Sequence, residues 1–182
     1  NIRKYLEELK SRANPLKSNI PNIKSIVVPH AGVVYSGLAM MSTYLSSYRQ
    51  NITRIILLST DHDSLEGANF INANSITTKN DSESFKIHLK NVKGNYTDIN
   101  NEHALLNQIP FIDFLYGNQV KVIPVIVGKI TLQQSKEIAT KLKPYLGPNT
   151  LIVCSTDFNH VNGRFQHKIF APNIQSKITN AD

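Results

Sequence analysis

The sequence of 182 residues contains one cysteine, Cys154, and no tryptophan. A single cysteine excludes an intramolecular disulfide framework, and a structural zinc site would need several cysteines or a tight Cys/His pattern. The chain also lacks an uninterrupted apolar run long enough to cross a bilayer, and residues 1–10 have a polar, helical pattern unlike a signal peptide. We therefore expect a cytoplasmic protein that does not associate with membranes.

Clusters of basic residues are also missing, although the net charge is +7. Nucleic-acid binding proteins gather Lys and Arg against phosphate backbones, whereas the lysines here are scattered and form no Arg-rich run or helix-turn-helix spacing. We expect a solvated basic surface and no nucleic-acid partner. The 41% hydrophobic and 18% charged content is typical of a globular chain, and the length predicts one domain over residues 1–182.

Strand and helix patterns alternate along the chain. Apolar runs predict strands over residues 25–30, 54–60, 120–128 and 150–157, with weaker strands of an antiparallel arm over 67–78 and 84–90. Helical patterns cover residues 3–10, 36–49, 102–117 and 131–146. Because strand 54–60 is continuously apolar rather than alternating, we expect helices on both faces of the sheet. The predicted fold is an α/β three-layer αβα sandwich with a mixed central sheet.

Three single residues refine these elements. Ser36 is a plausible N-cap for helix 36–49. Pro110 should end or kink helix 102–117, because proline cannot donate a backbone hydrogen bond. For the same reason, Pro124 predicts that strand 120–128 lies at a sheet edge or carries a bulge.

The histidines have an informative placement. His30, His62 and His160 each come just past a predicted buried strand, and His103 opens a predicted helix. In open α/β sheets the carboxyl ends of the strands border the ligand crevice. One histidine there would more often be structural, but three at one edge predict a functional crevice. The remaining two histidines, His88 and His167, lack this placement and are interpreted as structural or surface residues.

Carboxylates accompany these histidines in the sequence: Asp61, Asp63, Glu102 and Asp157. Imidazole beside carboxylate serves either metal ligation or general acid–base chemistry, and the spacing leaves both open. Asp157 has two equally weighted roles. It either orients a crevice histidine through the ring N–H or caps the turn that follows it.

Four ordered segments resemble the landmark segments of the MEMO family, also called AmmeMemoRadiSam system protein B. They are "VVPHAGVVYSG", "NEHALLNQIPF", "VIPVIVG" and "STDFNHVNGRF". The resemblance covers roughly residues 24–168. The opening segment usual in the family is missing before Asn1, and relatives continue past the last residues, so we expect a member that is short or trimmed at both ends.

The resemblance implies a fold similar to the class III extradiol dioxygenases, in which two histidines and a carboxylate hold ferrous iron while another histidine moves protons. By position, His30 and His62 match the histidine ligands and His103 matches the proton-transfer histidine. The third ligand position falls on Asn159, and a neutral amide is a poor ligand for a transition metal. Classical dioxygenase turnover is therefore not expected.

Two sequence departures bear on this site. Asp63 stands where relatives have a second consecutive histidine, and we interpret it as a solvated charge rather than a replacement ligand. Leu106 stands where relatives have a glutamate. Asp157 and His160 are the remaining candidates for catalytic residues.

Two classes of function remain open, and with them the question of whether the chain is an enzyme. The first is a metal-binding or redox-linked protein, with iron or copper as the metal and a radical SAM protein as the partner implied by the family name. The second is a non-catalytic scaffold whose crevice binds a peptide or a small ligand. A ring-cleaving non-heme iron dioxygenase is a third, lower alternative.

Overall fold

A mixed seven-stranded sheet forms the centre of the computed structural model, which describes residues 1–16, 22–63, 65–80, 82–99 and 101–157. The strand order is β1-β7-β2-β6-β5-β4, and β3 pairs with β6 beside this path. The strands are β1 (Ser25–Val28), β2 (Arg54–Thr60), β3 (Ala68–Phe70), β4 (Ser75–Asn80), β5 (Glu83–Leu89), β6 (Lys121–Val127) and β7 (Thr150–Ser155).

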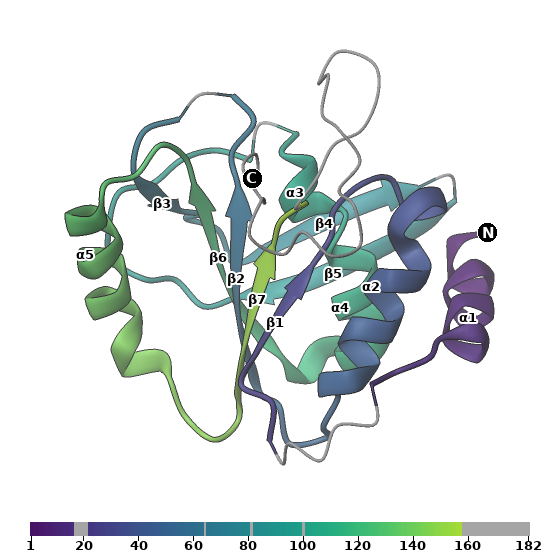
Figure 1. The fold of residues 1–182 in the computed structure, drawn as a ribbon. Coiled ribbons are helices and arrows are strands. Elements are labelled where there is room, and N and C mark those ends of the chain that lie inside the picture. Colours follow the sequence, from purple (N-terminus) through teal and green to yellow (C-terminus); the bar gives the residue numbers. More distant parts are fainter. Residues whose placement is uncertain (17–21, 64, 81, 100, 158–182) are drawn as a thin grey trace, which may run out of the picture.

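The sheet is parallel from β1 to β5 and antiparallel at its additions. β1, β7, β2, β6 and β5 pair in parallel, whereas β4 is antiparallel to β5 and β3 is antiparallel to β6. The mixed central sheet is therefore confirmed, and the weaker strand patterns do supply its antiparallel members. Because the core strands are parallel, their carboxyl ends lie at one edge, at the upper end of β2, β6 and β7 in Figure 1.

Helices cover both faces of the sheet (Figure 1). The helices of one face are α1 (Ile2–Arg12), α2 (Val33–Ser47), α3 (His103–Leu106) and α4 (Ile109–Tyr116), followed by the short 3-10 helix η1 (Gly117–Gln119). The opposite face carries α5 (Leu132–Leu142), which continues into the 3-10 helix η2 (Lys143–Tyr145). This arrangement confirms the three-layer αβα sandwich. Among the described residues, none of the helices combines the length and the apolar character needed to cross a membrane.

Alternation along the strands divides the core between the two layers. On β2, Ile55 and Leu57 pack into the cluster under α1, α2 and α4, while Ile56 packs into the cluster under α5. On β7, Val153 joins the first cluster and the half-buried Ile152 packs on the second. Burying a side chain of this size contributes roughly 1.5–3 kcal/mol. The continuous apolar pattern of these strands thus reflects burial on both faces.

Two helix boundaries differ from the sequence prediction. α2 begins at Val33 with Gly32 as its N-cap, so the Ser36 cap is wrong; the Ser36 hydroxyl instead donates to the carbonyl of Ala31 at 2.7 Å. The predicted helix 102–117 is divided into α3 and α4, and Pro110 lies in the first turn of α4. Proline is favoured there because its missing N–H has no helical acceptor.

Pro124 lies inside the sheet rather than at its edge. β6 pairs with β2 along its whole length, and on its other side it pairs first with β5 and then with β3. The Lys121 N–H donates to the carbonyl of Thr53, the residue before β2. Alternation therefore directs the nitrogen of Pro124 to the opposite side. Pro124 falls between the residues paired with β5 and those paired with β3. The missing donor is tolerated where β6 changes partner.

Candidate functional site

Three histidines meet at the carboxyl edge of the sheet. His30 follows β1, His62 follows β2, and His103 is the first residue of α3. Each offers one potential ligand atom, and these atoms all lie within 4.8 Å of one another. The ring centroids of His62 and His103 are 4.0 Å apart, and His30 lies 5.2 and 5.3 Å from them. The three imidazole nitrogens are therefore close enough together to contact one cation.

The three rings differ in their access to solvent. His30 is fully buried, whereas the side chains of His62 and His103 are 27% and 50% exposed. The cluster thus has a buried base and an open side. A solute approaching from solvent reaches His62 and His103 first.

Glu102 is the carboxylate that holds His62. Its Oε2 accepts the backbone N–H of His62 at 2.9 Å, and its Oε1 lies 2.8 Å from His62 Nδ1. Oε1 also accepts the backbone N–H of Ala104 at 2.8 Å, which makes Glu102 the N-cap of α3. Glu102 therefore joins the loop after β2 to the start of α3.

The charge of Glu102 determines which nitrogen of His62 is available. Burial alone would raise the pKa of Glu102, but the hydrogen bonds from Ala104 and from His62 outweigh it, and the pKa is lowered. An ionised carboxylate can only accept, so Nδ1 of His62 carries a hydrogen and Nε2 is the nitrogen available to a cation.

The backbone of His30 makes two hydrogen bonds to side chains. Its N–H donates to Asp157 Oδ1 at 2.8 Å, and its carbonyl accepts from Asn107 Nδ2 at 2.7 Å. Asp157 Oδ2 lies 3.7 Å from His30 Nε2, which is longer than a hydrogen bond. Asp157 thus contacts His30 through the backbone N–H, whereas the predicted orienting role is a hydrogen bond from the ring N–H; that role stays a prediction.

A buried polar chain lies beneath His30. Ser155 Oγ is 3.3 Å from His30 Nδ1 and donates to the carbonyl of Ala104 at 2.6 Å. Gln108 Nε2 donates to Ser155 Oγ at 3.0 Å, and the hydroxyl of Tyr44 donates to Gln108 Oε1 at 2.9 Å. Sequence reasoning missed Tyr44 and Ser155, although a serine directly before the Thr-Asp at the end of a buried strand was the available signal.

Asp61 and Asp63 are not members of the histidine cluster. Asp61 accepts the backbone N–H of Leu65 within the loop after β2, and Asp63 is exposed. Asn159 and His160 lie outside the described residues, as does His167. His88, interpreted as structural, pairs with Lys121 at the amino end of β6, which is the opposite edge of the sheet from the histidine cluster.

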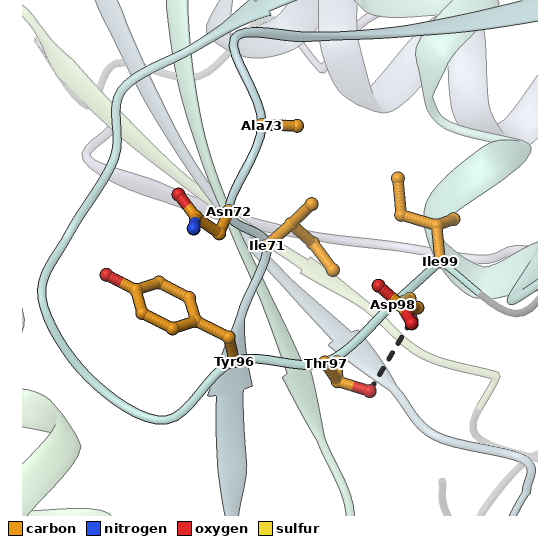
Figure 2. A pocket seen from close by; sticks show the side chains of 7 residues that line it. All are labelled: Ile71, Asn72, Ala73, Tyr96, Thr97, Asp98 and Ile99. Atoms are coloured by element: carbon orange, nitrogen blue, oxygen red, sulfur yellow. Dashed lines mark hydrogen bonds between the residues drawn. The ribbon is translucent and has the colours of Figure 1, made fainter.

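A separate cavity of ≈ 420 Å³ lies between residues 71–73 and 96–99. Figure 2 shows the side chains that line it. Its lining combines apolar side chains, among them Ile71 and Ile99, with the polar groups of Tyr96 and Asp98. None of the three clustered histidines lines it, although its wall at 96–99 belongs to the segment that leads to α3. The cavity and the histidine cluster are distinct features of the described chain.

Comparison with known proteins gives consistent matches. The family described as Memo-like protein matches residues 1–182. A MEMO1 family protein of Desulfurococcus amylolyticus is 29% identical over 80% of this chain and 57% of its own length. A MEMO1 family protein of Nitrosopumilus maritimus is 29% identical over 81% of this chain and 57% of its own, and one of Pyrobaculum arsenaticum is 30% identical over 74% and 52%. The chain therefore spans about half the length of these relatives.

Proposed function

Because the chain belongs to the Memo-like protein family, we propose that its three-histidine cluster binds a divalent transition metal. The proposal depends chiefly on one observation, the 4.8 Å limit within which the potential ligand atoms of His30, His62 and His103 lie. Imidazole nitrogens suit iron, copper, nickel and zinc, whereas magnesium and calcium prefer oxygen ligands. Iron or copper is the metal that the family resemblance favours.

The surroundings of the cluster fit such a cation. Metal-bound histidines usually donate their second ring N–H to a carboxylate or another acceptor, as His62 does to Glu102. The negative charge of Glu102 also lies 3.7 Å from His103 Nδ1, so it offsets part of the positive charge that a cation would bring. A bound metal would supply Lewis-acid or redox chemistry. The chain itself would hold the cation through His30 and His62.

His103 has two candidate roles beside these ligands. It is either a third nitrogen ligand or, as the family resemblance implies, a group that transfers a proton at the open side of the cluster. The half-exposed ring is compatible with both. The His103→Ala variant separates them, because loss of a ligand weakens metal binding whereas loss of a proton carrier leaves the affinity unchanged.

Metal analysis of protein purified without oxygen tests the proposal. Titration with Fe²⁺, Cu²⁺ or Zn²⁺ should reach one ion per chain, and the His30→Ala/His62→Ala double variant should lose that ion while retaining the circular dichroism spectrum of the fold. His88→Ala is the matched control, since His88 lies at the opposite sheet edge. Unchanged metal content in the double variant would contradict the proposal.

The cavity of Figure 2 favours a second candidate, a scaffold that binds a peptide or small ligand without chemistry. Its mixture of apolar walls with a phenol and a carboxylate is typical of small-ligand sites. NMR titration of metal-free protein with peptide and fragment libraries should then shift the amide signals of residues 96–99. A radical SAM partner belongs to the first candidate, and anaerobic co-purification with and without metal tests it.

A further inference from the structure

We infer that Ser155, supported by Gln108 and Tyr44, positions His30 by fixing its neutral ring with the hydrogen on Nδ1. Nε2 then carries the lone pair and is the nitrogen available to a cation. The purpose of this arrangement rests on the proposed metal binding, but the hydrogen position is a property of the metal-free chain. Ser155, Gln108 and Tyr44 are positioning residues, because none of them contributes an atom to the cluster itself.

The hydroxyl of Ser155 has one hydrogen and two lone pairs. Its oxygen lies 2.6 Å from the carbonyl oxygen of Ala104, and a carbonyl can only accept. The single hydrogen of Ser155 must therefore point to Ala104, because two bare oxygens at that distance would repel each other. The hydroxyl has no hydrogen left for His30, so at the 3.3 Å contact it can only accept from Nδ1–H.

The second lone pair of the Ser155 hydroxyl accepts a hydrogen bond from Gln108. Gln108 Nε2 lies 3.0 Å from the carbonyl of Pro29 and 3.0 Å from Ser155 Oγ. Only the amide nitrogen can donate to Pro29, so the oxygen of Gln108 must face Tyr44, which donates to it at 2.9 Å. Each group in this hydrogen-bond network then acts consistently as a donor or an acceptor. The reversed amide of Gln108 would place its oxygen opposite the carbonyl oxygen of Pro29, and both are acceptors.

Burial makes the network effective. Tyr44, Gln108 and His30 are fully buried, and Ser155 is buried as well. A buried polar group that loses its partner cannot turn to bulk water, and leaving it unsatisfied costs about 1–3 kcal/mol. The Nε2–H form of His30 would leave Nδ1 and Ser155 Oγ facing each other with no hydrogen between them. The cost of these unsatisfied groups disfavours the Nε2–H form.

Among the described residues, Asp157 has an opposing influence on the ring of His30. Its Oδ2 lies 3.7 Å from Nε2 and would favour a hydrogen on that nitrogen. The distance exceeds hydrogen-bond length, whereas the contact of Nδ1 with Ser155 does not. The attraction of Asp157 for an N–H is therefore weaker than the hydrogen bond to Ser155, and the Nδ1–H form prevails. When a cation binds Nε2, the charge of Asp157 becomes favourable instead.

Long-range ¹H–¹⁵N NMR of histidine-labelled, metal-free protein tests the inference directly, because protonated and bare ring nitrogens have distinct ¹⁵N shifts. The His30 signals are assigned by their loss in His30→Gln. In the wild type at pH above the titration of the ring, Nδ1 should be the protonated nitrogen. Finding Nε2–H in the wild type would overturn the inference.

Ser155→Ala should convert His30 to a mixture of the two forms and weaken Zn²⁺ binding about 10–100-fold. Tyr44→Phe should have a weaker effect on both the His30 ring form and Zn²⁺ binding, because the hydrogen bonds from Gln108 to Ser155 and from His30 to Ser155 remain. Ser59→Ala is the matched control: Ser59 is Ser155's partner in register on β2, is fully buried, and has no hydrogen-bond partner among the described residues for its hydroxyl. An unchanged His30 spectrum in Ser155→Ala would overturn the role of Ser155.

The two proposals fail separately. A wild type with Nδ1–H on His30 that binds none of the tested metals would contradict the proposed function and leave the positioning role intact. If the wild type binds metal but His30 carries its hydrogen on Nε2 in the metal-free protein, the positioning role is contradicted and the proposed function stands. Thermal unfolding of each variant shows that the compared proteins are folded.

Discussion

Glu102 contacts His62 through both of its carboxylate oxygens. One oxygen accepts the backbone N–H at 2.9 Å, and the other lies 2.8 Å from ring atom Nδ1. A single buried carboxylate therefore fixes both the loop position and the ring direction of this histidine. The oxygen at Nδ1 also caps α3 through Ala104, so the same group places the start of the helix that carries His103.

Glu102→Gln should weaken metal binding about 10–100-fold. The amide NH₂ group replaces one carboxylate oxygen and cannot accept the hydrogen bond that this oxygen now accepts. Unfolding free energy should fall by roughly 1–3 kcal/mol for the unsatisfied donor. Isothermal titration calorimetry and urea unfolding measure these two effects. Glu137→Gln on α5 is the control, since Glu137 is exposed on the other layer. Equal affinity in the two variants would contradict the role of Glu102.

Gly128→Ala should destabilise the fold by about 2 kcal/mol or more, because an added Cβ would overlap the backbone carbonyl of Leu65. Gly128 follows β6 and donates to the Gly67 carbonyl at 2.9 Å, which ties it to the loop that carries His62. Metal affinity should therefore fall as well.

Gly147→Ala provides the comparison for this substitution. A Cβ at Gly147 would meet no atom of the described residues within 4 Å, so the unfolding free energy of the Gly147→Ala variant should change by less than about 0.5 kcal/mol. Chemical denaturation of both variants measures the difference. Similar midpoints would show that the loop after β2 moves aside at little cost.

Alkaline pH should destabilise the protein through its buried tyrosines. Burial raises the pKa of Tyr116 to about 12, with neighbouring Tyr48 adding to the shift, and burial also raises the pKa of Tyr44 well above its ordinary value. A folded-state pKa above the unfolded value of about 10 means that the stabilising contribution is complete below pH ~10 and is lost as pH rises toward 12.

Urea unfolding at pH 8, 10 and 11 measures this loss. Tyr116→Phe should show a shallower decline in unfolding free energy than the wild type, by about 1.4 kcal/mol at pH 11. Tyr35→Phe is the control, because Tyr35 is 90% exposed. Parallel declines in all three proteins would assign the alkaline loss to other groups.

Iron-loaded protein should not cleave catechol rings. The dioxygenase resemblance places the third metal ligand at Asn159, whose side chain is neutral. In the described chain, the third candidate ligand beside His30 and His62 is the imidazole of His103 rather than a carboxylate. An anionic ligand helps to hold ferrous iron in the facial geometry that leaves open positions. To check this prediction, the protein is reconstituted with iron without oxygen and then given oxygen and a panel of catechols. The absorbance of ring-opened product measures turnover. Turnover that disappears in His103→Ala would contradict it.

Much of the fold could be predicted from residue patterns because its strands are buried on both sides. β2 spans the predicted residues 54–60, since a continuous apolar run leaves little choice of boundary. The placement of His30 and His62 at one edge follows from the same strands. The position of Pro124 could not be predicted in this way, because its tolerance depends on the change of strand partner from β5 to β3 along β6.

The groups that hold the histidines were harder to predict. Glu102 is adjacent to His103 in sequence, yet its side chain turns to His62, because an N-cap side chain folds back over the helix start. Ser155 lies in a strand, and its face is defined only once β7 is in register with β1 and β2. Such contacts depend on three-dimensional packing between segments distant in sequence.

The three clustered histidines come from segments separated by roughly thirty to forty residues of chain. A cation held by all three would close two long loops at once, in the way that a disulfide restricts an unfolded chain. Binding would then stabilise the folded state by mass action, and the melting temperature would rise with metal concentration. A metal-binding cluster would thus make the stability of the folded protein depend on the metal concentration.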